Sequence, residues 1–139
     1  MDDVLVGSLM SSPVRTVRPD ESVRDAAQVM IDRDISSVVV VDGDNQPVGI
    51  LTSTDCVHVA ADGAATDETP VSAYASADLV ATTASVPVGE VAETMMADGV
   101  HHVPVVDEDE GAVGMITTKD FAAYLSEARA PSPPRPTEQ

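Results

Sequence analysis

Apolar residues along the chain alternate between helix-like and strand-like spacing, and their order predicts a mixed α/β protein. Residues 22–34 carry apolar side chains at the three- and four-residue spacing of a helix, namely Val23, Ala26, Ala27 and Met30. Ser22, with Asp25 three residues later, has the spacing of a capping box. The run over residues 35–42 ends as a continuous apolar strand, and residues 48–52 predict a second strand, antiparallel to the first across a short polar turn.

The second half of the chain repeats this order of elements at a constant offset of 65 residues. Residues 38–55 align with residues 103–120 without a gap, and nine of the eighteen pairs are identical. Both copies contain the pattern Gly-apolar-apolar-Thr-x-x-Asp, as "VGILTSTD" from Val48 and as "VGMITTKD" from Val113, and a helix is predicted to follow each. Gly99 suits the C-terminal end of the repeated first helix.

The repeat predicts an α/β fold in which two β-α-β-β-α units pack with pseudo-twofold symmetry into one globule. Each unit has about 60 residues, which is near the lower size limit for independent folding, so each needs the other to bury its apolar faces. We expect repeat 1 over residues 4–61, a linker over 62–70, repeat 2 over 71–128 and a disordered proline-rich tail over 129–139. Pro104, inside a predicted strand, indicates an edge position or a bulge.

Charge narrows the range of possible partners. The chain has 7 Lys+Arg against 24 Asp+Glu, a formal net charge of −17, which repels nucleic-acid phosphates and anionic membranes and argues against both as partners. The only lysine is Lys119, and aromatic residues make up 2% of the chain. This composition resembles that of proteins from salt-loving archaea, in which salt screens the repulsion between surface carboxylates. We therefore expect a halophilic archaeal source, with an acidic mesophilic protein as the alternative.

The single cysteine and the start of the chain indicate a cytoplasmic protein. Cys56 has no second cysteine with which to form an intrachain disulfide. The first ten residues are acidic without a long apolar run, and no later stretch approaches the length of a membrane span. Cys56 and His58 lie on different faces of one predicted helix, which argues against a nucleophile–base pair. Without a catalytic triad, paired catalytic carboxylates or a Walker loop, the sequence predicts a protein that is not an enzyme.

The repeated Gly-apolar-apolar-Thr-x-x-Asp pattern has a chemistry of its own. Its glycine permits another backbone to approach closely, and its Thr ends a strand and starts a helix. The Asp lies in the first helical turn, where backbone N–H groups and the positive end of the helix dipole favour a phosphate. A carboxylate also accepts two hydrogen bonds side by side, which suits the vicinal diol of ribose. The alternative is that Thr and Asp only cap the helix, since both do so without a ligand.

The helix–strand–turn–strand–helix order, the "VPVVD" strand and the repeated motif resemble a tandem pair of CBS domains, also called a Bateman module, over Val4 to Leu125. The resemblance implies a regulatory module that binds an adenosine-containing ligand, such as AMP, ATP or S-adenosylmethionine, in clefts between the repeats. It implies no required cofactor, a homodimer, and an unidentified effector protein that reads the signal. Two alternatives stay open, namely a ligand-free scaffold that only pairs chains and catalysis at an unrecognised site.

The resemblance also implies two unequal clefts, each built from both repeats. The implied residues of the first cleft are Thr52, Asp55, Leu79, Val80, His101, His102 and Lys119. Those of the second cleft are Val14, Arg15, Thr117 and Asp120, with Ser36 and Ser37 where the first cleft has its two histidines. The Thr and Asp of each cleft are expected to hold ribose, the paired residues of the other repeat the base, and basic residues the phosphates. Serine in place of histidine predicts weaker phosphate binding in the second cleft, so Asp55 is the stronger candidate.

A metal site at the adjacent histidines is not expected. Neighbouring residues on a strand point to opposite faces, so His101 and His102 cannot easily share one ion, even with His58. One of the two is expected to face solvent or the core. For Lys119 the alternative is a solvated position on its helix.

Overall fold

The computed structural model of the protein describes residues 4–129. Its elements in chain order are α1 (Val6–Leu9), β1 (Thr16–Val17), α2 (Val23–Arg33), β2 (Ser37–Val41), β3 (Pro47–Thr52), α3 (Ser53–Ala61), the 3-10 turn η1 (Val71–Ala73), α4 (Val88–Asp98), β4 (His102–Asp107), β5 (Gly111–Thr117) and α5 (Thr118–Arg129). The predicted disordered tail over residues 129–139 lies outside the described residues, except for Arg129, which ends α5.

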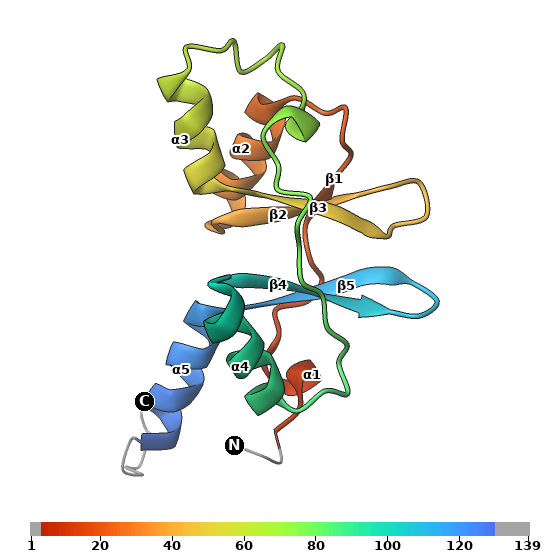
Figure 1. The fold of residues 1–139 in the computed structure, drawn as a ribbon, viewed down its shortest axis with the longest axis vertical. Helices are drawn as coiled ribbons and strands as arrows, with labels where there is room; N and C mark the ends of the chain where they lie inside the picture. The colour runs from red at the N-terminus through yellow and green to blue at the C-terminus, as the bar shows by residue number, and fades with distance from the viewer. Residues whose placement is uncertain (1–3, 130–139) are drawn as a thin grey trace.

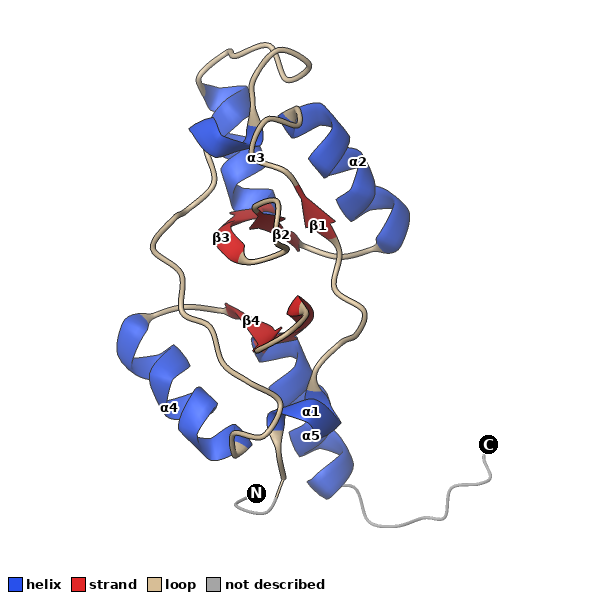
Figure 2. Cartoon of the chain, turned by 90° about the vertical axis from the view of Figure 1, so that its right-hand side faces the viewer, coloured by secondary structure: helices blue, strands red, loops and turns tan. Residues whose placement is uncertain are grey.

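Two small β-sheets face each other in the middle of the molecule, and helices cover the outer side of each (Figure 1, Figure 2). In the first sheet β1 runs parallel to β2, and β2 runs antiparallel to β3. The second sheet pairs β4 with β5 antiparallel, so Pro104 in β4 has the edge position that was predicted. Helices α2 and α3 cover the first sheet, and α4 and α5 cover the second. The predicted α/β fold with two packed repeats is confirmed.

The offset of 65 residues also relates the details of the two repeats. Helices α2 and α4 begin 65 residues apart, and the bulge after Val40 in one hairpin recurs after Val105 in the other. The predicted cap of α2 is confirmed, because Ser22 Oγ accepts the N–H of Asp25 at 3.0 Å. Gly99 ends α4 in the left-handed conformation, with φ 68°, as expected. Local sequence signals therefore determine where the elements of both repeats begin and end.

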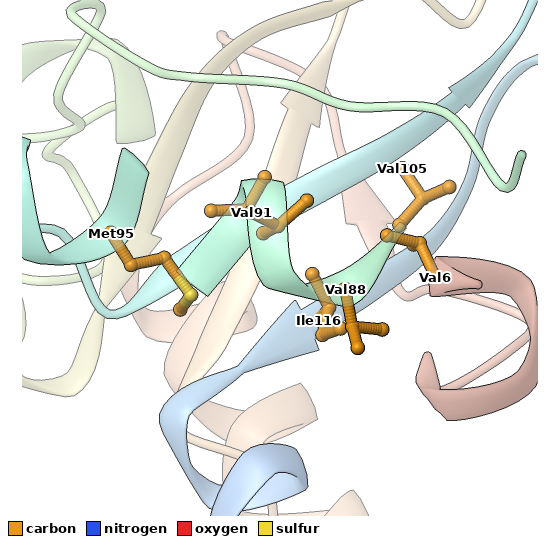
Figure 3. Close-up of a cluster of buried hydrophobic side chains, with 7 residues drawn as sticks. Val6, Val88, Val91, Met95, Val105 and Ile116 are labelled. Carbon is orange, nitrogen blue, oxygen red and sulfur yellow. The ribbon is translucent and has the colours of Figure 1, made fainter. Parts of the chain in front are cut away.

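Three clusters of buried apolar residues stabilise this arrangement. One fills the second repeat and consists of Val6, Val88, Val91, Met95, Val103, Val105 and Ile116 (Figure 3). Another fills the first repeat and consists of Val17, Ala26, Met30, Val38, Val40, Leu51 and Val71. The third lies between the sheets and consists of Val39, Val41, Ile50, Ala112 and Met115. Because this third cluster draws on both repeats, burial of apolar surface holds the two repeats together as one globule.

The first segment of each repeat packs on the other repeat. Val6 of α1 is buried in the core of the second repeat, against α4, and its N–H donates to the carbonyl of Val86 at 2.8 Å (Figure 3). In return, Val71 of η1 is buried in the core of the first repeat, and its N–H donates to the carbonyl of Glu21 at 2.7 Å. This exchange ties each repeat to the other through the backbone, and the sequence repeat alone does not reveal it.

The exchanged segments explain the glycine of each motif. Ile50 and Ser76 exchange two backbone hydrogen bonds of 2.9 Å, so the segment crosses β3 beside Gly49. A Cβ at Gly49 would lie 2.9 Å from the carbonyl oxygen of Ser76, closer than Cβ atoms normally come. At the equivalent Gly114, a Cβ would lie 3.0 Å from the carbonyl oxygen of Ser11. The close backbone approach predicted for this glycine is confirmed, and the approaching backbone belongs to the exchanged segment.

Candidate ligand-binding clefts between the repeats

Each motif aspartate closes a capping box at the start of a helix. At α3, the Thr52 N–H donates to Asp55 Oδ2 at 2.8 Å, and the Asp55 N–H donates to Thr52 Oγ1 at 3.3 Å. At α5, the same two bonds join Thr117 and Asp120 at 2.8 and 3.3 Å. Both threonine hydroxyls donate to the same Oδ2, at 3.0 and 3.2 Å. In the described part of the chain these caps use Oδ2, which leaves Oδ1 of each carboxylate available for a ligand.

A cavity of about 340 Å³ lies between the repeats beside the first motif. Its lining residues are Ser36, Ile50, Thr52, Ser53, Thr54, Ser76, Asp78, Leu79, Val80, Val100, His101 and His102. Five of them were expected in the first cleft, namely Thr52, Leu79, Val80, His101 and His102. Asp55 and Lys119 were also expected there, but neither is part of this lining.

A larger cavity of about 660 Å³ lies beside the second motif. Its lining residues are Ser11, Pro13, Val14, Arg15, Asp34, Ile35, Ser36, Ser37, Ser53, Met115, Thr117, Lys119, Asp120 and Ala123. They include every residue expected in the second cleft, and also Lys119, which was assigned to the first. The reason for this correction is that Lys119 directly precedes Asp120 at the start of α5, so one helical turn brings both to the same cavity. Both volumes are in the usual range for small-molecule sites.

The two cavities are built from equivalent positions of the repeat. Ten lining positions correspond after a shift of 65 residues: Ser11 and Ser76, Pro13 and Asp78, Val14 and Leu79, Arg15 and Val80, Ile35 and Val100, Ser36 and His101, Ser37 and His102, Met115 and Ile50, Thr117 and Thr52, and Lys119 and Thr54. The pseudo-twofold symmetry of the backbone therefore extends to the cavities, whereas many of the side chains that line them differ.

These differences place the strongly basic groups in the second cavity. Arg15 and Lys119 line it, where the first cavity has Val80 and Thr54. They are two of only seven basic residues in the chain, and between residues 34 and 128 Lys119 is the only lysine or arginine. The sequence ranking of the two clefts, which rested on the histidines of the first, is therefore not supported by the distribution of permanent charge.

His102 is a hydrogen-bonding group and a poor cation. Burial lowers the pKa of its half-buried ring, and the neighbouring His101 lowers that pKa further. The Nε2 atom of His102 lies 3.2 Å from the hydroxyl oxygen of Ser36, so this hydrogen bond joins the two repeats. His101 is exposed at the edge of the same cavity. At neutral pH the first cavity therefore offers a neutral ring to a ligand.

Sequence analysis missed residues that reach the cavities through the exchanged segments and the shared wall. Ser11 and Ser76 cross the strands beside the motif glycines and line one cavity each. Ser53, together with Ser36, lines both cavities. The offset of 65 residues relates Ser11 to Ser76 and is the signal that could have located them. Ser53 had no such signal, because a shared wall depends on how the repeats pack.

Three further findings concern chemistry outside the two cavities. Within residues 4–129, no group of three or more His, Cys, Asp or Glu side chains is placed to hold a metal ion. No helix over the same range is both long and apolar enough to cross a membrane. Cys56 is a half-buried free cysteine that packs against the core of the first repeat. Burial raises the pKa of its thiol and the charge of Asp55 raises it further, so the reactive thiolate is disfavoured.

Comparison with known proteins identifies the family of this chain. The family model for the CBS domain matches it twice, over residues 6–62 and 71–127. The chain belongs to the CBS-domain family and carries two CBS domains in tandem, as the resemblance implied.

Individual relatives show how far this similarity extends. An uncharacterised 17.7 kDa protein of Acidianus ambivalens is 26% identical over 134 residues, which cover 96% of this chain and 80% of that protein. The CBS domain pair of protein MJ0100, in complex with 5′-methylthioadenosine and S-adenosyl-L-methionine, matches the fold with a TM-score of 0.83 at 26% identity, over 91% of this chain and 98% of that one. Inosine-5′-monophosphate dehydrogenase of Methanocaldococcus jannaschii is 35% identical over 78% of this chain, but the match spans only 21% of the enzyme.

Proposed function

We propose that this protein is a regulatory sensor that binds an adenosine-containing ligand in the clefts between its two CBS domains. The observation that carries the proposal is the second cavity, where Thr117 and Asp120 start a helix beside Arg15 and Lys119. Oδ1 of Asp120 suits a ribose hydroxyl, and the helix start with two cations suits an anionic group. The similarity to the MJ0100 domain pair, whose structure contains two adenosine compounds, supports the same class of ligand here.

The signal in this proposal is a change in the arrangement of the two repeats. Both cavities are lined by residues of both repeats, so a ligand in either contacts the two halves at once. Such a ligand shifts the population toward the arrangement that closes the cleft, by as much as its affinity differs between the arrangements. An effector protein then reads the change. We propose no catalytic step, and a cytoplasmic location in keeping with the free cysteine Cys56.

Calorimetric titration with AMP, ATP and S-adenosylmethionine in concentrated KCl tests the proposal. We expect saturable binding of at least one ligand, weakened at least about tenfold in Asp120→Ala because a charge-assisted contact is lost. Asp44→Ala, in the turn between β2 and β3, removes the same charge away from both cavities and is expected to bind as the unmodified protein does. No binding across the panel would instead support the ligand-free scaffold.

We also propose that the outer helices form a homodimer contact. Four large apolar side chains on these helices are exposed, namely Ile31 at 72%, Val57 at 66%, Met96 at 85% and Leu125 at 45%. Ile31 on α2 and Met96 on α4 are equivalent by the offset of 65 residues, so both repeats present an apolar position on the same helix face. Sedimentation equilibrium is expected to show a dimer that Ile31→Glu with Met96→Glu weakens, and a monomer before substitution would contradict this part of the proposal.

A further inference from the structure

We infer that the two clefts select different adenosine compounds by charge: the second takes one that carries phosphate, and the first takes one without phosphate. This inference rests on the proposed function, since it assigns a class of ligand to each cleft. The clefts share equivalent backbone positions, so a difference in selectivity has to come from the side chains that differ between them.

The second cleft concentrates positive charge where a phosphate would need it. Arg15 is half-buried in its wall, and Lys119 is exposed at its edge, in the first turn of α5. A guanidinium group matches two phosphate oxygens at once, and partial burial reduces screening of its charge by salt. The helix N-terminus adds backbone N–H groups on the same side.

Two carboxylates also line the second cleft, and their positions limit their effect. Asp120 Oδ2 already accepts hydrogen bonds from the backbone N–H and the hydroxyl of Thr117, which disperse part of its charge. Asp34 lies at the C-terminal cap of α2, in the left-handed conformation. With Arg15 and Lys119 the formal charge of the lining is balanced, in a chain whose net charge is −17. This lining therefore opposes an anion far less than the rest of the surface does.

The first cleft has the opposite character. The equivalents of Arg15 and Lys119 are the neutral Val80 and Thr54, and Asp78 adds a carboxylate where the second cleft has Pro13. A phosphate here would meet the charge of Asp78, with neutral histidine as its main hydrogen-bonding partner. Apolar side chains line much of the remainder, namely Ile50, Leu79, Val80 and Val100. This smaller, apolar cavity suits a nucleoside with an uncharged 5′ substituent.

Calorimetry with AMP and 5′-methylthioadenosine, at one fixed salt concentration, tests the inference. We expect AMP to bind equally well when 5′-methylthioadenosine is already saturating, because the two occupy different clefts. The variants are Arg15→Val and Lys119→Thr, each of which installs the residue found at the equivalent position of the first cleft. Each is expected to weaken AMP binding by about tenfold to a hundredfold and to leave 5′-methylthioadenosine binding unchanged. Arg24→Gln, on the exposed side of α2, is the matched loss of one positive charge and is expected to leave both ligands unaffected.

The outcomes separate this inference from the proposed function on which it rests. Competition of the two ligands for one site, or equal weakening of both in the variants, would overturn selection by charge while adenosine binding itself stands. Binding of neither ligand to the unmodified protein would overturn the proposed function. Circular dichroism checks that each variant is folded, and Lys119→Thr, at an exposed position, carries the test if Arg15→Val loses structure.

Discussion

Asp55 and Asp120 show how two residues with the same local role come to differ in their surroundings. Each closes a capping box with nearly the same distances, so the helix starts alone do not distinguish them. Only Asp120 lines a cavity, and it does so beside two cations. The capping role proposed as an alternative is confirmed for both residues, and a ligand contact by Asp120 is compatible with it.

Alanine at these two positions separates capping from ligand binding. We expect Asp55→Ala and Asp120→Ala to lower the free energy of unfolding by similar amounts, about 0.5–2 kcal/mol, because each loses an equivalent cap. Only Asp120→Ala is expected to weaken AMP binding. Urea denaturation and calorimetry measure the two effects, and an equal loss of AMP affinity in both variants would contradict the assignment of AMP to the second cleft.

The half-buried His102 predicts a pH dependence of stability. Its pKa in the folded protein lies below the ordinary value of about 6.5. As the pH falls, the unfolded chain therefore takes up this proton first, and stability is lost from about pH 6.5 down to the folded pKa. Between about pH 7.5 and pH 5.5, the unmodified protein is expected to lose more unfolding free energy than His102→Gln does. Equal losses, measured by urea denaturation, would show that His102 titrates normally.

At the scale of elements, the crossing of each exchanged segment over a strand is the contact most sensitive to substitution. Gly49→Ala is expected to lower the free energy of unfolding by about 1–3 kcal/mol, because the added Cβ meets the backbone oxygen of Ser76. Gly89→Ala in α4 is the control, since a Cβ there meets nothing within 4 Å and helix propensity favours alanine by about 0.5–1 kcal/mol. Thermal unfolding compares them, and a neutral Gly49→Ala would show that the crossing is loose.

The elements themselves could be predicted from the sequence, but the partners of the exchanged segments could not. Helical spacing after Ser22 and the cap at Gly99 are local signals, and the structure follows them. The burial of Val6 in the second repeat and of Val71 in the first depends on contacts between distant segments. Local periodicity does not record which core a short apolar segment joins. The motif glycine was predicted correctly for its close approach, without the identity of the approaching chain.

For the whole molecule, the dominant physical property is the net charge of −17. Repulsion among surface carboxylates opposes the compact state and is screened by salt. We expect the melting temperature to rise from dilute buffer to molar KCl, which would support the halophilic source that remains a prediction. A melting temperature that does not change with KCl would remove the support for it. Differential scanning calorimetry over a KCl series makes this measurement.

The candidate site shows the same division between local and global information. The repeat located most of the lining residues, because equivalent positions meet equivalent surroundings. It misplaced Lys119, since which cleft receives a side chain at a helix start depends on the packing of the two repeats. Ser53, which lines both cavities, escaped for the same reason. The relative charge of the two clefts became clear only when Arg15 and Lys119 were found together.

Binding of an adenosine compound between the repeats is tested most directly by amide chemical-shift mapping during titration with AMP. The predicted shifts centre on the second cavity, at Thr117, Lys119, Asp120 and the adjoining segment around Arg15. Saturation of these shifts together, with one dissociation constant, would support binding in that cleft. Shifts confined to the outer helices around Ile31 and Met96, or no shifts at millimolar AMP, would contradict it.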